Sequence, residues 1–418
     1  MRTAILLLTV ALLPSVATAA EIPKGQYKLI TKGTDGSAAT DDSDTPAISS
    51  NGKSLAITTL SSNFGPETFN GFRQVVRFTT QGQPVESISR MAGGQLANHD
   101  CSESRLSKSG RYVAFECKSA LGLVGPPGGS YRVFRRDTKT GELVHVSLSP
   151  TGEVANDTCL LNDISDNGRF VLFTTMATNM VAGSSPWESR GFLHDVETGT
   201  TELVTVNEQG LPLDGSIFTL DISGDARFVF FSSNAPNLGN GSQFQIYVRD
   251  RQLGTTTLLS KNSAGVAGAD TNIVMSVSRN GRYILMYTAS SNLGVSLKPG
   301  NLVVLDRKKS EMRALDIEMP GMTDEIAVEQ CSISNDGRRV VLTAEYTKAS
   351  TGATVGKMCE FDRKTGKRWT IVSKTGSNVS LAKLSFSASA KGDWIFFATS
   401  FDLLESNGKS DGYLYRAH

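Results

Sequence analysis

Histidine side chains are the first candidates for chemistry in this sequence. The chain has four, His99, His145, His194 and His418, and no two of them have the short spacing of a metal site. His145 and His194 fall within expected strands, and His99, beside Asp100, is the only one that we place in a loop near a pocket. His99 is therefore the one weak candidate for a catalytic base, with a neighbouring aspartate to orient it.

Acidic residues gather in segments that would connect successive strands. These are Asp41, Asp42, Asp44, Asp100, Glu103, Asp157, Asp163, Asp214, Asp221, Asp270, Glu325 and Glu329. Together they would form an acidic rim that suits a basic peptide or a cation, and the ordinary alternative is a set of solvated loops. We take Asp41, Asp42, His99, Asp100, Asp157, Asp214 and Asp270 as candidate binding residues. No cofactor is predicted. Calcium is left open, because the densest cluster, at 41–44, lacks the spacing of an EF-hand loop.

Aromatic residues in polar segments are a second kind of candidate. Trp187 lies in such a segment, so we add it to the binding residues, although a tryptophan folded onto its own sheet is the alternative. Phe64 and Phe69 present the same choice. The stretch 408–412 matches the G-x-S-x-G string, but that string has meaning only between a strand and a helix, so we discount it.

The elements that would position these residues are revealed by a repeat. The stretch Ser165-Asp166-Asn167-Gly168-Arg169 has six relatives, which begin at Ser49, Ser107, Ser223, Ser278, Ser334 and Ser389. A second glycine precedes each copy at a constant offset, at Gly36, Gly94, Gly152, Gly210, Gly265, Gly321 and Gly376, so the repeat length is 55 to 58 residues. Two signals that keep in step over seven units indicate one repetitive domain.

One unit predicts four short strands. In the third unit the first strand ends at Ile164, and the others span 169–175, 190–195 and 201–206. The second is apolar almost throughout, so it must be covered on both faces. Seven antiparallel four-stranded sheets of this kind predict an all-β, seven-bladed β-propeller. The segment 25–31 resembles a fourth strand and 413–416 a third strand, so we expect Tyr27–Thr31 to pair with Tyr413–Arg416 and close the ring.

The units resemble a known family of repeats. Gly-Arg-aromatic-Val-x-Phe, then Ala235-Pro236-Asn237-Leu238, then Val-Arg-Asp-x-x-x-Gly at 248–254, are similar to the TolB-type, WD40-like (PD40) propeller repeats of bacterial envelope and secreted proteins. The resemblance covers nearly the whole chain after residue 20 and implies architecture and compartment. TolB carries an additional α/β domain before its propeller, and we expect no counterpart of that domain here.

The leader indicates export, and in an exported chain the five cysteines raise the question of disulfides. Residues 1–20 read as a signal peptide, with Arg2, an apolar run over 4–13 and small residues at 17–19, which leaves 21–418 as a single propeller domain in the periplasm or secreted. No segment is long enough to cross a membrane. We expect a disulfide between Cys101 and Cys117, which hairpin counting places nearly opposite each other, with Cys101 to Cys159 as second choice. Cys331 and Cys359 would lie on non-adjacent strands.

The balance of basic and acidic residues argues against one class of function. The chain has 42 basic and 41 acidic side chains, a balance that is not typical of a nucleic-acid-binding protein. We expect a non-enzymatic scaffold that binds a protein or peptide, with a glycan as an alternative partner, through its variable loop face. The alternative function is a hydrolase or lyase that uses an axial pocket, with His99 as base.

Overall fold

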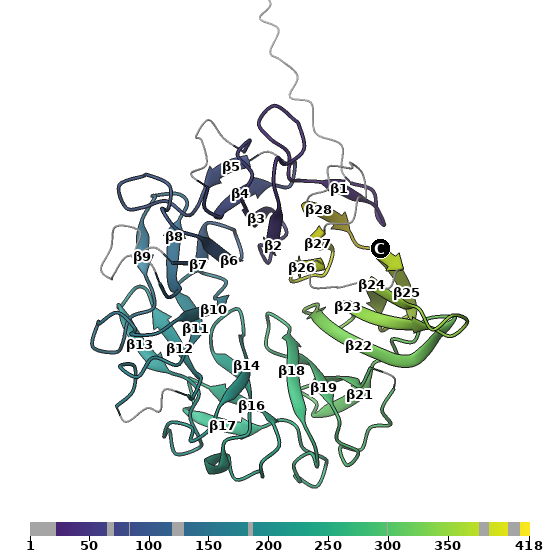
Figure 1. Cartoon of the computed structure of the whole chain (residues 1–418). Helices are drawn as coiled ribbons and strands as arrows, with labels where there is room; N and C mark the ends of the chain where they lie inside the picture. The colour runs from purple at the N-terminus through teal and green to yellow at the C-terminus, as the bar shows by residue number, and fades with distance from the viewer. Residues whose placement is uncertain are drawn as a thin grey trace, which may run out of the picture.

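The computed structural model describes residues 22–64, 71–82, 84–118, 129–182, 187–298, 300–375, 384–399 and 410–418. They form seven separate four-stranded antiparallel sheets arranged around an axis, as Figure 1 shows. The only helical element in these residues is a short 3-10 helix, η1 (Pro236–Leu238). The predicted all-β, seven-bladed propeller is confirmed. The proposed signal peptide at 1–20 lies outside the described residues.

The first four blades have similar strands. Blade 1 is β2 (Ser43–Ile48), β3 (Ser54–Thr59), β4 (Gln74–Thr79) and β5 (Pro84–Ser87). Blade 2 is β6 (Cys101–Leu106), β7 (Tyr112–Cys117), β8 (Arg132–Asp137) and β9 (Leu143–His145). Blade 3 is β10 (Cys159–Ile164), β11 (Phe170–Thr175), β12 (Arg190–Asp195) and β13 (Thr200–Leu203). Blade 4 is β14 (Ile217–Ile222), β15 (Phe228–Ser233), β16 (Gln245–Asp250) and β17 (Thr255–Leu258).

The remaining blades include one that is longer than the rest. Blade 5 is β18 (Asn272–Val277), β19 (Tyr283–Thr288), β20 (Leu302–Asp306) and β21 (Glu311–Ala314). Blade 6, the longer one, is β22 (Met322–Ile333), β23 (Arg339–Lys348), β24 (Thr354–Asp362) and β25 (Lys367–Thr375). Blade 7 is β26 (Leu384–Ala388), β27 (Trp394–Thr399), β28 (Asp411–Arg416) and β1 (Tyr27–Leu29).

The two ends of the chain close the ring. In blade 7, β1 pairs antiparallel with β28, with Tyr27 opposite Tyr415 and Leu29 opposite Tyr413. The N-terminal strand therefore supplies the fourth strand of a sheet whose other three come from the C-terminal segment, as the aligned ends predicted. This arrangement pairs strand edges that would otherwise be open.

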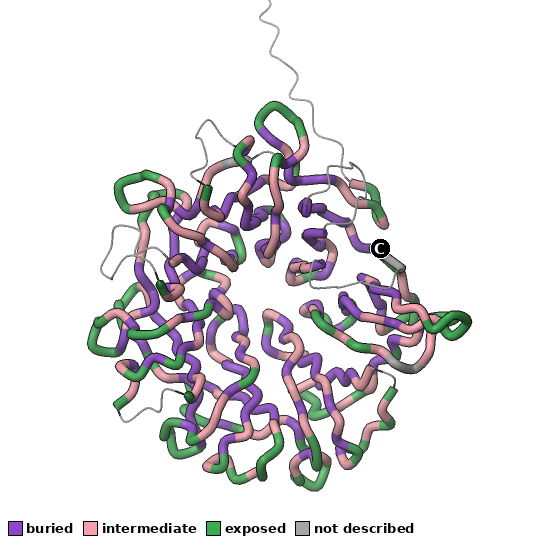
Figure 2. The backbone as a smooth tube through the Cα atoms, viewed as in Figure 1, coloured by how far each residue is buried: buried purple, intermediate pink, exposed green. Residues whose placement is uncertain are grey.

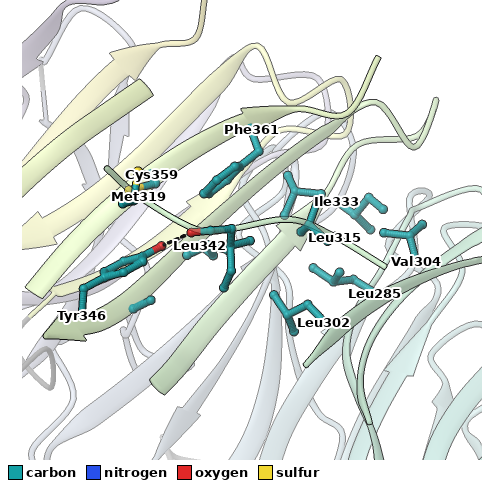
Figure 3. Packing of buried hydrophobic residues seen from close by; sticks show 13 residues of the cluster. Leu285, Leu302, Val304, Leu315, Met319, Ile333, Leu342, Tyr346, Cys359 and Phe361 are labelled. Carbon is teal, nitrogen blue, oxygen red and sulfur yellow. Dashed lines mark hydrogen bonds between the residues drawn. The ribbon is translucent and has the colours of Figure 1, made fainter. Parts of the chain in front are cut away.

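The core lies between blades. The described residues form seven hydrophobic clusters, and each combines side chains of two neighbouring blades around the ring. Figure 3 shows the cluster of blades 5 and 6, in which Leu285 and Leu302 of one blade approach Leu342 and Phe361 of the next. The buried backbone in Figure 2 follows the strands, and exposed backbone gathers in the outer loops. A single blade could not bury its own apolar faces, so its stability depends on its neighbours.

The repeated turn explains the repeated sequence. Ser165 and Asn167 accept hydrogen bonds from the backbone N–H groups of Phe170 (2.9 Å) and Arg169 (3.0 Å). Gly168 has a positive φ of 75°, and a Cβ there would lie 2.1 Å from the Tyr112 ring of blade 2. Glycine is thus needed both for the turn and for close contact with the preceding blade.

The arginine after that glycine reaches the third strand of its own blade. Arg169 forms an ion pair with Asp195, with Nη2 2.6 Å from Oδ2. The same pairing joins Arg111 to Asp137, Arg227 to Asp250, Arg282 to Asp306 and Arg338 to Asp362. The Gly-Arg and Asp-x-x-x-Gly signals therefore mark the two ends of one ion pair, a relationship that the sequence analysis did not identify.

The structure joins Cys101 to Cys117 in a disulfide. These residues lie opposite each other on β6 and β7. Cys159 is buried and free, and Cys331 and Cys359 are free on β22 and β24, which are separated by β23. No helix among the described residues is long and apolar enough to span a membrane.

Candidate binding site at the propeller axis

The first strand of each blade lies nearest the axis, as Figure 1 shows. In five consecutive blades this strand contains a β-bulge, at Glu103, Asn162, Phe218, Met275 and Glu329. A bulge turns a side chain away from the regular alternation of the strand. Four of these five residues, all except Phe218, line an axial cavity of about 440 Å³, which we call the axial pocket.

A ring of hydrogen bonds closes the turn end of the propeller around the axis. It links the first turn of each blade to that of the next. The bonds run from Asn51 N to Lys108 O, Lys108 N to Asp166 O, Asp166 N to Gly224 O, Gly224 N to Arg279 O, Asn280 Nδ2 to Asn335 O, Asn335 N to Ala390 O and Ala390 N to Ser50 O. We call this ring the floor of the axial pocket. Because every blade takes part, the floor fixes the distance of each inner strand from the axis.

Arg279 reaches past blade 4 to blade 3 beside the floor. It starts from the first turn of blade 5 and forms ion pairs with Asp163 and Asp166 of blade 3, and its Nη2 also donates to the carbonyl of Ile164 (2.7 Å). Ser50 of blade 1 donates to the same Asp166 carboxylate (3.2 Å). Burial alone would lower the pKa of Arg279, but Asp163 and Asp166 outweigh it and hold the pKa above its ordinary value.

The charges that line the axial pocket are not balanced. Its lining includes four carboxylates and two arginines. Both arginines already have acidic partners, because Arg105 Nη1 lies 3.1 Å from Glu103 Oε2 and Arg279 is paired with Asp163. Asp221 and Glu329 form no ion pair with an arginine in the described lining, although the charge of Arg279 still acts on Asp221. The pocket therefore has an excess of negative charge.

Asp221 is the carboxylate with the most perturbed titration in the pocket. Burial raises the pKa of Asp221 to about 7, the charge of nearby Asp163 adds to the effect, and Arg279 opposes it. Its oxygens accept hydrogen bonds from the backbone N–H groups of Ile222 (2.7 Å) and Val277 (3.2 Å). The pKa of Glu329 is also raised, first by burial and then by Glu345. A bound cation would favour the charged form of both.

The six aspartates that were chosen from the sequence as binding residues lie in loops and have backbone partners there. Their carboxylates accept from neighbouring N–H groups, as follows: Asp41 from Asp42, Asp42 from Ser410, Asp100 from Arg73, Asp157 from Thr158, Asp214 from Asn237 and Asp270 from Thr271, over 2.6 to 2.9 Å. None of them is among the residues that line the axial pocket. They order the loops before the inner strands.

Several acids that we had assigned to loops lie in strands. Asp44, Glu103, Asp163, Asp221, Glu325 and Glu329 belong to β2, β6, β10, β14 and β22. The assignment to connectors was wrong because an inner strand beside the axial pocket can carry polar side chains, so its sequence resembles a loop. The two acids that remain without an arginine, Asp221 and Glu329, are both in this group.

The other candidates lie apart from the axial pocket. The His99 ring packs against Phe72, with ring centroids 5.6 Å apart, and it does not line the axial pocket. Trp187 is 82% exposed, just before β12. Phe64 is buried against Phe78 rather than presented to solvent, and Phe69 lies outside the described residues. The described residues contain no group of three or more His, Cys, Asp or Glu placed to hold a metal.

Comparison with known proteins supports the fold. The sequence matches no protein-family model, and no curated protein compared with it is a detectable relative. Among solved structures, an oligogalacturonate lyase from Vibrio parahaemolyticus has a TM-score of 0.54 and 11% identity, over 93% of this chain and 96% of that chain. The propeller domain of the trilobed protease from Pyrococcus furiosus has a TM-score of 0.49 and 12% identity, over 86% and 90% of the two chains. A protein assigned to TolB from Agrobacterium tumefaciens has a TM-score of 0.37 and 13% identity, over 90% and 91%. At 11% identity the likeness to the lyase concerns the fold alone.

Proposed function

We propose that this chain is an exported, non-enzymatic propeller that binds a protein or peptide by receiving a basic side chain in the axial pocket. The observation that carries the proposal is the charge of the lining, in which two arginines are already paired while Asp221 and Glu329 are not. An ammonium or guanidinium group between these carboxylates would give each of them a cationic partner. Charge-assisted hydrogen bonds of this kind are among the stronger polar contacts in proteins.

The position of the floor favours a ligand that enters the axial pocket from the end opposite the floor. The turn end is bridged by the ring of hydrogen bonds and by Arg279, so a ligand would reach the axial pocket from the end that carries the connectors between blades. The exposed side chains of Leu160 and Phe218 lie near the start of the inner strands, toward that end. A side chain that projects from a larger partner could thus enter while the partner contacts the loops.

Export is supported by the leader sequence and by the disulfide. Residues 1–20 have the pattern of a signal peptide, and a bond between Cys101 and Cys117 is typical of an oxidising compartment. We therefore place the protein in the periplasm or outside the cell. The alternative, a hydrolase or lyase with His99 as base, has no support from the geometry, since His99 lies against Phe72 and not in the axial pocket.

The test is titration calorimetry with a trilysine peptide, and with a triglutamate peptide as the charge control. We expect the wild type to bind trilysine and not triglutamate. The double variant Asp221→Asn, Glu329→Gln should lose at least tenfold in affinity for trilysine. Asp157→Asn, which removes an acid of the loops and keeps an oxygen acceptor, should stay within twofold. Equal affinity of the double variant and the wild type would refute the proposal.

A further inference from the structure

Polar side chains connect neighbouring blades at their outer strands. In blades 3 and 4 the hydroxyls of Thr201 and Thr256 donate to the carbonyls of Leu148 and Val206 in the preceding connectors, each over 2.8 Å. In blade 2, Arg136 Nε donates to the carbonyl of Ile88 (2.7 Å). We call these bonds the junction ties. They join the third and fourth strands of one blade to the connector of the blade before it.

Blade 6 has a junction tie from Arg368 of its fourth strand, and Tyr346 of its second strand bonds to the same connector. Arg368 donates to the carbonyl of Glu318, and Figure 3 shows the hydroxyl of Tyr346 directed at a carbonyl oxygen, which is that of Ile317 (3.2 Å). Four junctions, between blades 1 and 2, 2 and 3, 3 and 4, and 5 and 6, therefore share this device.

The junction between blades 4 and 5 differs. The cross-strand pair that supplies the tie is His194 with Thr201 in blade 3 and Arg249 with Thr256 in blade 4, and in blade 5 it is Leu305 with Met312. Neither leucine nor methionine has a hydrogen-bond donor in its side chain. At this junction the protein has a cavity of about 710 Å³, lined by both Leu305 and Met312, which we call the junction groove.

The junction groove has an apolar wall. Leu259, Leu293, Leu305 and Met312 line it, and Leu253 lies at its edge with 69% of its surface exposed. A cavity between about 300 and 1,000 Å³ that combines apolar walls with a few polar groups is typical of sites for small molecules.

The charged side chains that line the junction groove favour an apolar ligand that carries a negative charge. Its lining includes two cations, Lys261 and Arg307, and one carboxylate, Asp250. Asp250 is already neutralised by Arg227, whose Nη2 lies 2.7 Å from Oδ2 and which holds the pKa of Asp250 below its ordinary value. Arg307 is fixed over the Phe228 ring, 3.8 Å from its centroid, and donates from Nε to the carbonyl of Gly281. The groove therefore presents net positive charge beside an apolar wall.

We propose that the junction groove binds a single aliphatic chain that ends in a carboxylate, as in a fatty acid. The chain lies against Leu259, Leu293, Leu305 and Met312, and the carboxylate faces Lys261 and Arg307. This site is separate from the axial pocket and does not depend on the function proposed there. The space that the ligand occupies lies where the polar tie of the other junctions is missing.

Calorimetry with dodecanoate below its micelle concentration tests this proposal, with dodecanol and dodecyltrimethylammonium as neutral and cationic probes. We expect one dodecanoate per chain and at least tenfold weaker binding of both other probes. Absence of dodecanoate binding, or equal affinity for dodecanol, would overturn the proposal.

Two variants locate the site. The double variant Leu305→His, Met312→Thr recreates the pair of blade 3, and Met312→Phe fills the groove without adding a polar group. Each should weaken dodecanoate binding at least tenfold and leave the thermal midpoint within a few degrees of wild type. Leu211→Ala, which removes an exposed apolar side chain from another connector, is the matched control and should bind like wild type. Wild-type affinity in a folded Met312→Phe variant would contradict the site.

Discussion

Arg279 in the first turn of blade 5 is paired with Asp163 in the inner strand of blade 3, so one side chain bypasses blade 4 and joins two blades that are not neighbours. The residues are 116 positions apart in the sequence. This pair, with Asp166 and Ser50, determines which acids of the axial pocket are neutralised and which remain available.

Removal of Arg279 should be costly. Arg279→Met would leave Asp163 and Asp166 in a half-buried site without their cation, and breaking such a pair costs about 3 kcal/mol. We expect a clear fall in the urea midpoint at pH 8 and a smaller fall at pH 5, where Asp221 is protonated and the remaining acids repel one another less. Arg282→Met, which removes the arginine at the end of the same turn, where it pairs with Asp306 of its own blade, serves as the comparison. An unchanged midpoint for Arg279→Met would show that the pair is energetically unimportant.

Cation binding should depend on pH through Asp221. Because its pKa is raised to about 7, the carboxyl is mostly neutral at pH 5.5 and mostly charged at pH 8. The affinity for trilysine should therefore increase between these values. Asp221→Asn should flatten that part of the profile. A wild-type affinity that is constant from pH 5.5 to 8 would exclude Asp221 as a binding group.

The Asp221 carboxyl should also affect the stability of the fold, but this contribution should fall, not rise, with pH. A carboxyl whose pKa is higher in the folded than in the unfolded protein holds its proton longer when folded, so the free energy of unfolding decreases as pH rises from about 4 to 7. Asp221→Asn removes this loss. We expect the urea midpoint of the variant, relative to wild type, to rise between pH 5 and pH 8. A constant difference would contradict the assignment of the raised pKa.

The predicted closure of the ring is confirmed almost residue by residue. It could be predicted because the last blade lacks a fourth strand in the C-terminal sequence, while the N-terminal sequence resembles such a strand. Tyr27 to Leu29 and Tyr413 to Tyr415 pair as the alignment required. An axial pocket was expected, and its four carboxylates, Glu103, Asp163, Asp221 and Glu329, were all in the predicted acidic rim, but their position in the inner strands was not predicted. A bulge such as that at Asn162 breaks the alternation of the strand, so the acids beside it resembled loop residues. The pair between Arg279 and Asp163 has no signal in local spacing, since only the closed ring brings these residues together.

Glycines in the turns of the repeat should be sensitive to substitution for two separable reasons, backbone strain and contact with the neighbouring blade. Gly199→Ala introduces a side chain at a φ of 69° with no atom within 4 Å, so it should cost about 1 kcal/mol from backbone strain alone. Gly168→Ala adds a clash with Tyr112 to a similar strain and should cost roughly 1–3 kcal/mol more. Chemical unfolding of both variants measures the difference. Equal costs would mean that the contact between blades 2 and 3 adapts freely.

The disulfide should stabilise blade 2. It closes a loop with a sequence separation of 16, for which the loss of chain entropy in the unfolded state is roughly 3 kcal/mol. Replacement of Cys101 and Cys117 together by serine should lower the urea midpoint, and a reducing agent should lower that of the wild type but not that of the variant. Cys159→Ser, which removes a free thiol, controls for effects of the reductant on other cysteines.

The most direct test of the axial pocket is a crystal structure of the protein soaked with the trilysine peptide. The account predicts a lysine ammonium within hydrogen-bond distance of the Asp221 and Glu329 carboxylates, with the peptide backbone toward the connector end. A peptide bound only at the loop acids, such as Asp157 and Asp270, with solvent in the axial pocket, would contradict it.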